Sequence, residues 1–199
     1  MDMQRVSSVL QRNGFAVCFF ETAKEAADYL DASIRGKTVG IGGSITIEQI
    51  GLFERLAKNN TVFWHWRTND LETRLAAANA DVYLTSANAI AETGEIINID
   101  GSGNRVAASL YHHERVVFVV GINKIAPDYE SAMSRARNVA APLNARRLKR
   151  NTPCAVSKEM KCYDCSSEDR ICNGVVTLLR PMGGVGTTEV VLIGENLGY

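Results

Sequence analysis

Short apolar runs alternate with stretches of helical spacing along the first 85 residues, and this alternation constrains the fold more than any other feature. The apolar runs have the length of β-strands and cover residues 15–20, 37–42, 61–64 and 81–85. The helical stretches cover residues 6–10, 22–32, 46–59 and 69–79. Strands that alternate with helices form βαβ units, in which the strands run parallel and the crossovers are right-handed. The sequence therefore predicts an α/β fold built on a parallel sheet.

The pattern changes after residue 85, where shorter strand-like pieces replace the helices. These pieces cover residues 87–91, 95–99 and 106–108, with turn pairs at 93–94 and 100–101. Closely spaced strands joined by such turns predict antiparallel hairpins. Residues 115–121 form the most apolar run and predict a buried central strand. The remaining expected elements are a helix over 128–140, which Pro142 ends or kinks, and strands over 175–179 and 189–193.

The size and charge of the chain limit the classes of function. A chain of 199 residues has the length of one domain, so we expect residues 1–199 to form a single domain. Its formal net charge is zero, which argues against a nucleic-acid partner. No apolar run reaches the length of a transmembrane helix, and the N-terminus lacks the apolar stretch of a signal peptide. We therefore expect a cytoplasmic protein with no membrane partner.

A glycine-rich turn lies between the apolar run 37–42 and the helical stretch that follows it. Gly42 and Gly43 allow a ligand to approach the backbone closely, while Ser44 and Thr46 add hydroxyl groups. Ligands of open α/β sheets bind at the carboxyl ends of strands, and helix N-termini attract anions. The turn therefore predicts a phosphate or carboxylate site. The competing interpretation is a tight turn in which a hydroxyl caps the helix.

A carboxylate follows the apolar run 87–91 directly. Glu92 precedes the turn pair Thr93-Gly94 at the end of this run. A carboxylate in such a position can act as a general base or as a nucleophile. The alternative is a turn residue that faces solvent.

Two further positions place polar side chains beside predicted strands. Asn104 and Arg105 follow the turn residues 100–103, where they either reach a ligand or belong to the tip of a hairpin. Asn123 and Lys124 follow the central run 115–121. A lysine there either neutralises a bound phosphate or carboxylate, or lies exposed in a loop. These four residues, together with the turn pair Thr93-Gly94, complete the predicted anion site.

Four cysteines gather within residues 152–173 with the spacing C-x7-C-x2-C-x6-C: Cys154, Cys162, Cys165 and Cys172. A C-x2-C pair places two sulfurs on one turn, which suits Zn²⁺ or an iron–sulfur cluster. The alternatives are reduced or redox-active thiols, or disulfides. Disulfides are the weakest of these, because thiols stay reduced in the cytoplasm. The basic residues within 146–150 would favour thiolates in the segment that follows. Residues 166–169 are typical of a helix cap, which predicts that Cys172 is helical.

Several of these motifs occur together in an order that resembles the LUD-domain family of lactate-utilisation proteins. They are Gly42-Gly43-Ser44 with Thr46, AIAETG at 89–94, DGSGNRVA at 100–107, VVGINKI at 119–125, AAPLNARRL at 140–148, the cysteine segment at 152–173 and ENLGY at 195–199. Each piece is weak alone, but the ordered set spans nearly the whole chain. The cysteine segment is typical of a short-chain branch of this family.

The resemblance implies a fold similar to NagB, ribose-5-phosphate isomerase and CoA-transferase, which is a Rossmann-like parallel sheet with a β-rich insertion. It implies that a small anionic metabolite binds near the glycine turn, and Glu92 resembles the nucleophile of CoA-transferases, although Thr93 replaces the asparagine found there. Because the family works in redox metabolism, the resemblance favours an iron–sulfur cluster over zinc and an iron–sulfur protein as partner. It leaves open a non-catalytic subunit or redox relay in place of an enzyme. A homodimer is also implied, supported by exposed aromatic residues expected at 64–66.

Overall fold

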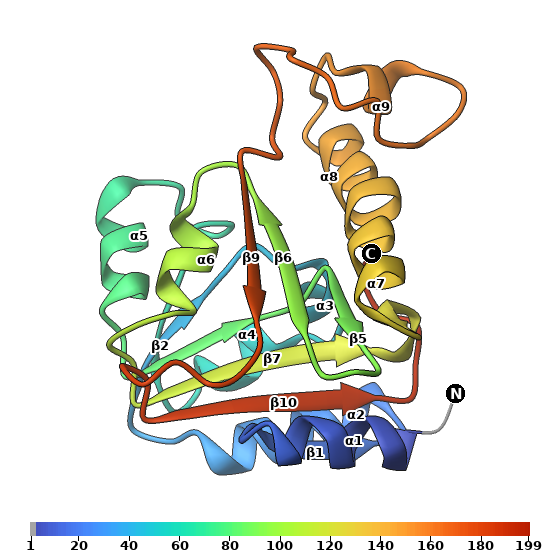
Figure 1. Cartoon of the computed structure of the whole chain (residues 1–199). Helices are drawn as coiled ribbons and strands as arrows, with labels where there is room; N and C mark the ends of the chain where they lie inside the picture. Colours follow the sequence, from blue (N-terminus) through green and yellow to red (C-terminus); the bar gives the residue numbers. More distant parts are fainter. Residues whose placement is uncertain (1–2) are drawn as a thin grey trace.

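The computed structural model describes residues 3–199, so residues 1 and 2 of the expected domain lie outside the described part. Its base is a six-stranded sheet in which all neighbouring strands are parallel (Figure 1). In spatial order the strands are β1 (Ala16–Phe20), β10 (Thr187–Ile193), β7 (Arg115–Gly121), β4 (Val82–Thr85), β2 (Thr38–Ile41) and β3 (Thr61–Trp64). The Rossmann-like α/β prediction is confirmed, and β7 lies inside the sheet as expected.

Apolar side chains of β7 divide the core between the two faces of this sheet. Val117 and Val119 pack with the helices α2 (Ala23–Ser33), α3 (Ile45–Gln49) and α4 (Leu52–Leu56). Val116, Phe118 and Val120 pack on the other face with α1 (Met3–Arg12) and with strands of a second sheet. Successive side chains of a strand point to opposite faces, so an unbroken apolar run is what a doubly covered strand requires.

The helix predicted over residues 46–59 is wrong, because two short helices, α3 and α4, occupy that stretch. Gly51 separates them in the left-handed region, with φ of 63°. Glycine adopts that conformation without the steric cost that a Cβ imposes, so it allows the chain to turn there. The predicted capping box of α2 is confirmed, since Thr22 and Glu25 exchange side-chain and backbone hydrogen bonds. The fifth helix, α5 (Leu71–Ala78), begins after Asp70, which caps it.

A second sheet of four strands stands on the first, in the order β8 (Ile125–Ala126), β5 (Ala89–Ala91), β6 (Ile96–Asp100) and β9 (Gly174–Leu178) (Figure 1). The predicted hairpin of β5 and β6 is antiparallel, as is the pairing of β6 with β9. This sheet is the β-rich insertion that was expected. Its apolar side chains fill the space above the parallel sheet on one side and pack against a long helix on the other.

The strand predicted at residues 106–108 is wrong, because the chain forms the helix α6 (Asn104–Ala108) there. The carboxylate of Asp100 accepts hydrogen bonds from the backbone N–H groups of Ser102, Gly103 and Val106. These bonds turn the chain out of β6 and satisfy donors at the start of the helix. The glycine-rich residues 101–103 therefore connect a strand to a helix and not to another strand.

A long helical segment runs from α7 (Tyr129–Arg135) through a π-helical turn at Ala136–Ala140 into α8 (Ala141–Arg147). The prediction that Pro142 ends the helix is wrong, because Pro142 lies in the first turn of α8 and the helical segment continues through it. Proline lacks an N–H group and crowds the preceding turn, and the wider π turn accommodates both effects. The N–H of Ala141 accordingly donates to the carbonyl of Ala136, five residues back.

The cysteine segment projects beyond the end of α8 and returns into β9 (Figure 1). Its one described helix is α9 (Pro153–Val156), and Cys172 lies in no helix, contrary to the prediction. The reason is that the guanidinium of Arg170 donates to the backbone carbonyls of Cys165 and Cys172. These carbonyls therefore accept from a side chain and not from the N–H groups of a helix. Across residues 3–199, no helix is long and apolar enough to cross a membrane.

Candidate functional site

A cleft of about 830 Å³ opens at the carboxyl ends of the central parallel strands. Gly43 follows β2, Ser86 follows β4, and Lys124 follows β7, and all three line this cleft. Carboxyl ends of parallel strands meet at one edge of a sheet, which is where ligands of open α/β folds bind. Residues from the cysteine segment, including Arg170 and Ile171, form part of the opposite wall.

Lys124 lies at the bottom of the cleft with only 3% of its surface exposed. Its Nζ donates to the hydroxyl oxygens of Thr46, at 2.9 Å, and Ser86, at 3.0 Å. Among the described residues, no carboxylate forms an ion pair with it. Buried lysines are rare unless they are paired, so this amine is an unusual feature of the fold.

Burial, together with the positive charges of Arg135 and Arg105, lowers the pKa of Lys124 to about 7. Arg135 is itself held by two backbone carbonyls, those of Asn123 and Asn88. Both the burial and the neighbouring charges disfavour the protonated amine. A bound anion would relieve this excess of positive charge.

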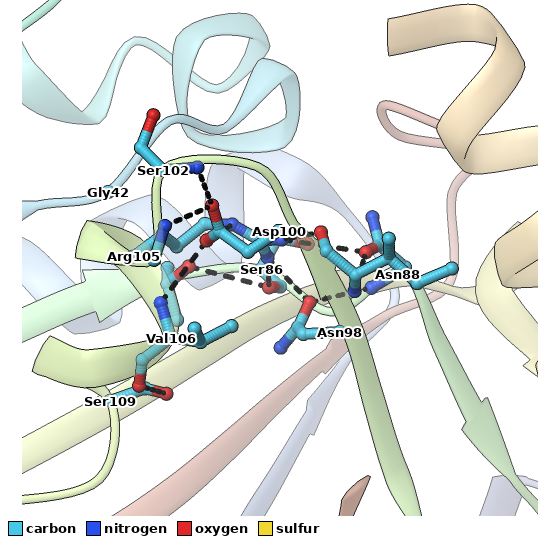
Figure 2. A network of polar contacts seen from close by, with 12 residues as sticks. Gly42, Ser86, Asn88, Asn98, Asp100, Ser102, Arg105, Val106 and Ser109 are labelled. Atoms are coloured by element: carbon cyan, nitrogen blue, oxygen red, sulfur yellow. Dashed lines mark hydrogen bonds and ion pairs between the residues drawn. The ribbon is translucent and has the colours of Figure 1, made fainter. Parts of the chain in front are cut away.

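Arg105 lies in a cage of acceptors between the second sheet and the end of β4 (Figure 2). Its guanidinium donates to the side chains of Asn98 and Asn88 and to the carbonyls of Ser86 and Ile99. Its Nε lies 3.5 Å from the carboxylate of Asp100. Burial lowers the pKa of Arg105, and Asp100 opposes this effect. Arg105 therefore lines the cleft mainly as a fixed charge, and Asn104 lines the cleft beside it.

The glycine turn serves close packing and helix capping. A Cβ on Gly42 would lie 2.7 Å from the Tyr83 hydroxyl, and one on Gly43 would lie 3.3 Å from Nε1 of Trp66. The Ser44 hydroxyl accepts the N–H of Ile47 and so caps α3. Thr46 is fully buried and contacts Lys124. The capping interpretation of Ser44 is thus confirmed, while Gly43 and Ser44 also line the cleft.

Aromatic and basic residues form a further part of the cleft wall, with Trp66, Arg147 and Tyr199 among the lining residues. Trp66 stacks on Trp64, and the guanidinium of Arg147 lies 4.6 Å from the ring centre of Trp66. Arg147 also donates to the Tyr199 hydroxyl at 2.8 Å. Trp64 is 1% exposed, so the expected exposed aromatic patch at 64–66 is wrong, and the homodimer stays a prediction without that support. His65 borders the cleft, where burial lowers its pKa.

Six residues predicted for the catalytic and anion sites lie outside the lining of the cleft within the described chain: Gly42, Thr46, Glu92, Thr93, Gly94 and Asn123. The turn that holds Glu92 packs beside α1, since a Cβ on Gly94 would lie 3.0 Å from the Val9 side chain. Asn123 instead holds the C-terminal residues, accepting from the N–H of Leu197 and donating to the carbonyl of Gly198. The roles predicted for these residues stay predictions.

Two residues beside Lys124 were absent from the predicted site. Ser86 follows the strand at 82–85 directly, so the rule that selected Lys124 would also have selected it. Arg135 lies at the end of α7, distant in sequence from the strand ends. Only the packing of α7 against the second sheet brings it near Lys124, and no sequence motif indicated that.

The four cysteines of the segment are free thiols that share one neighbourhood. Burial raises the pKa of Cys172, and negative charge on Cys162, Cys154 and Cys165 would raise it further, while Arg170 lowers it. The sulfur of Cys162 accepts the N–H of Asp164 at 3.4 Å. A cavity of about 20 Å³ lies against Cys162 and Cys172.

The donor set suits a thiolate-binding metal, and backbone N–H groups commonly bond to metal-bound sulfur. Within residues 3–199, however, no three potential ligands lie close enough to bind one ion. The sulfurs would therefore have to approach one another to hold zinc or an iron–sulfur cluster. The segment contains only one four-residue helix, so few backbone hydrogen bonds oppose such a movement.

Comparison with known proteins agrees with this architecture. The chain matches the LUD domain family over residues 3–193. It is similar in fold to the crystal structure of a DUF162 family protein from Deinococcus radiodurans, with a TM-score of 0.56 and 14% sequence identity over 96% of this chain and 95% of that one. No curated protein matches it. Because the family match extends over nearly the whole sequence, the chain belongs to the LUD domain family.

Proposed function

We propose that this protein binds a small organic anion, with a carboxylate or phosphate group against Lys124. The observation that carries the proposal is the amine of Lys124, which is buried at the bottom of the cleft without a carboxylate among the described residues. An unneutralised cation in a dry site gains strongly from an anionic ligand. Family membership favours lactate or another organic acid as the metabolic setting.

The charges along the cleft support an anionic ligand. Basic side chains outnumber acidic ones by seven to four: Arg67, Arg74, Arg105, Lys124, Arg147, Arg150 and Arg170 against Glu48, Asp100, Glu168 and Asp169. Walls of one predominant sign concentrate ligands of the opposite sign. The volume of about 830 Å³ lies within the range of sites for small molecules.

The test is a titration of lactate, pyruvate and inorganic phosphate into the protein, measured by calorimetry and by tryptophan fluorescence, to which Trp66 in the cleft wall contributes. We expect at least one of these anions to bind, and Lys124→Met to weaken it about 10- to 100-fold, as for a charged hydrogen bond. Lys58→Met is the matched control, because Lys58 is exposed at the end of α4. Equal affinity of the two variants for every anion would contradict the proposal.

Glu92 offers a second variant, since its turn was predicted to supply a base or nucleophile. Because this turn packs beside α1 and outside the cleft lining, Glu92→Gln should leave the anion affinity within about twofold of wild type. A larger loss of affinity would place Glu92 in the binding site. Loss of turnover with unchanged affinity would support the predicted catalytic role.

A second candidate function is a redox relay that docks an iron–sulfur partner through residues 152–173. It is favoured by the shared neighbourhood of four free thiols, which follow the basic residues of α8. Thiolates beside cations are the chemistry that binds iron or zinc and exchanges electrons with a partner.

This second function is tested on protein purified without oxygen, by visible absorption and by assays of iron, zinc and acid-labile sulfide. Iron with sulfide would support a relay, and zinc alone would indicate that the segment is a structural metal site. Cys162→Ser should lose the metal, whereas Cys18→Ser in β1 should keep it. Metal-free protein whose thiols all titrate as free would contradict the candidate.

A further inference from the structure

We propose that Lys124 is also a nucleophile, whose amine forms an imine with a small aldehyde or ketone that carries a carboxylate or phosphate. This inference rests on the proposed function, because it assigns a substrate class to the same cleft. It adds a covalent step that anion binding alone does not require.

The surroundings of Nζ favour a neutral amine. It contacts two hydroxyl oxygens, of Thr46 and Ser86, and among the described residues no carboxylate holds a proton on it. The charged groups that act on it are Arg135 and Arg105, which repel the protonated form. A lysine in a dry site beside other cations is activated as a nucleophile in this way, because its lone pair is free at neutral pH.

The chain leaves little room for other groups beside the amine. A Cβ on Gly198 would lie 3.1 Å from Nζ and 2.6 Å from the Thr46 hydroxyl, so the C-terminal residues cover one side of it. The open side is the cleft, which Lys124 lines. A ligand therefore reaches Nζ from one direction only, which fixes the approach of an electrophile.

The chemistry requires no group from outside the cleft and its ligand. The Nζ lone pair attacks the carbonyl carbon, so that a C–N bond forms and the carbonyl π bond breaks. Both amine protons move to the carbonyl oxygen, which leaves as water when the C=N bond forms. The Ser86 and Thr46 hydroxyls lie at 3.0 and 2.9 Å from Nζ and can relay these protons.

The acidic group of the substrate follows from charge. Uptake of one proton from solvent by the imine nitrogen makes it a cation, in the place where two arginines already disfavour positive charge. A carboxylate or phosphate on the same molecule compensates that charge, whereas a neutral aldehyde does not. Both groups share this chemistry, so two probes are needed to distinguish them.

The experiment treats the whole protein with sodium borohydride in the presence of pyruvate, as the carboxylate probe, or dihydroxyacetone phosphate, as the phosphate probe. Borohydride reduces an imine to a stable secondary amine. We expect one reduced adduct by intact mass and a peptide map that places it on Lys124. Lactate is the negative control, because it lacks a carbonyl group. Which probe gives the adduct identifies the acidic group.

The peptide map locates the adduct in the wild-type protein, so the test does not depend on whether a variant folds. Lys124→Met should abolish the adduct and Lys58→Met should leave its yield unchanged. Calorimetry without borohydride separates the two proposals: a probe that binds but leaves no adduct on Lys124 overturns the imine and leaves anion binding intact. Adducts spread over exposed lysines also overturn it. Absence of both binding and adduct, for both probes, overturns the imine and contradicts the proposed function with it.

Discussion

At the scale of single residues, burial of the Lys124 amine lowers the stability of the folded state. Its pKa falls from 10.5 to about 7 on folding, so the unfolded chain binds more protons between these values. The penalty is complete below pH 7 and fades as the pH rises toward 10.5. The free energy of unfolding therefore increases with pH between pH 7 and pH 10.5 as far as Lys124 determines it.

Lys124→Met should raise the free energy of unfolding at pH 6 by on the order of 3 kcal/mol, after allowance for the two hydroxyls left without their donor. At pH 9.5 the gain should fall to about 0 kcal/mol, because the wild-type amine is then neutral in the folded state and the small remaining penalty is offset by the two hydroxyls left without their donor. Urea unfolding at the two pH values, in buffers without small organic acids or phosphate, measures the difference. A gain that is independent of pH would contradict the lowered pKa.

A second pair of residues tests burial of charge. Arg115 on β7 and Glu189 on β10 form an ion pair whose side chains are 19% and 4% exposed. Removing one partner of a buried pair leaves the other charge uncompensated, so Glu189→Gln should cost about 3 kcal/mol of stability. The matched control is Glu114→Gln, which breaks an exposed pair with Lys37 and should cost less than about 1 kcal/mol. Equal losses in thermal unfolding would contradict this distinction.

The sequence located part of the candidate site at residue level. Gly43, Ser44, Asn104, Arg105 and Lys124 line the cleft as expected, because strand ends and turns are visible in the sequence. The environment of Lys124 was not predictable, since its burial and the nearby Arg135 depend on how α7 packs.

At the scale of elements, close packing of β2 against α5 depends on Gly40. A Cβ there would lie 2.2 Å from the carbonyl oxygen of Ala77. Gly40→Ala should therefore destabilise the protein by about 1–3 kcal/mol through overpacking. Gly174→Ala on β9 is the control, because nothing lies within 4 Å of its Cβ position. A cost for Gly174→Ala as large as that for Gly40→Ala, in denaturant unfolding, would show that close approach is not the cause.

Strands were more predictable than helices in this chain. The apolar runs matched the six parallel strands because burial on both faces leaves a strong pattern. The stretch 46–59 split at Gly51, and 104–108 became helical through the Asp100 carboxylate. In both places a single residue's backbone or side-chain contacts outweighed the local apolar pattern.

At the scale of the whole molecule, the cysteine segment and the anion cleft share a wall. Arg170 binds carbonyls of the segment and lines the cleft, and it also borders the small cavity beside Cys172. The sequence predicted both sites but not their contact, because the two lie in different parts of the chain. Their contact arises from the return of the chain along β9 onto β6.

Arg170→Met should therefore affect both sites. We expect anion affinity to fall about tenfold, since one cation leaves the wall and the segment loses its anchor. We also expect faster alkylation of Cys172 by iodoacetamide at a pH high enough to ionise the thiol in both proteins, because the sulfur becomes more exposed and the lowering of its pKa by Arg170 no longer affects the rate. Arg12→Met, in the exposed last turn of α1, is the control and should change neither. Unchanged thiol reactivity in the Arg170 variant would contradict the shared wall.

The most direct test of the account is an NMR titration of the lysine side chains, with Lys124→Met used to assign the Lys124 resonance. We expect Lys124 to titrate near pH 7 in the free protein and its pKa to move upward on addition of pyruvate or phosphate. A Lys124 that titrates near the reference value for lysine, about 10.4, and does not respond to either anion, would contradict the claim that this cleft binds anions through a buried, unneutralised amine.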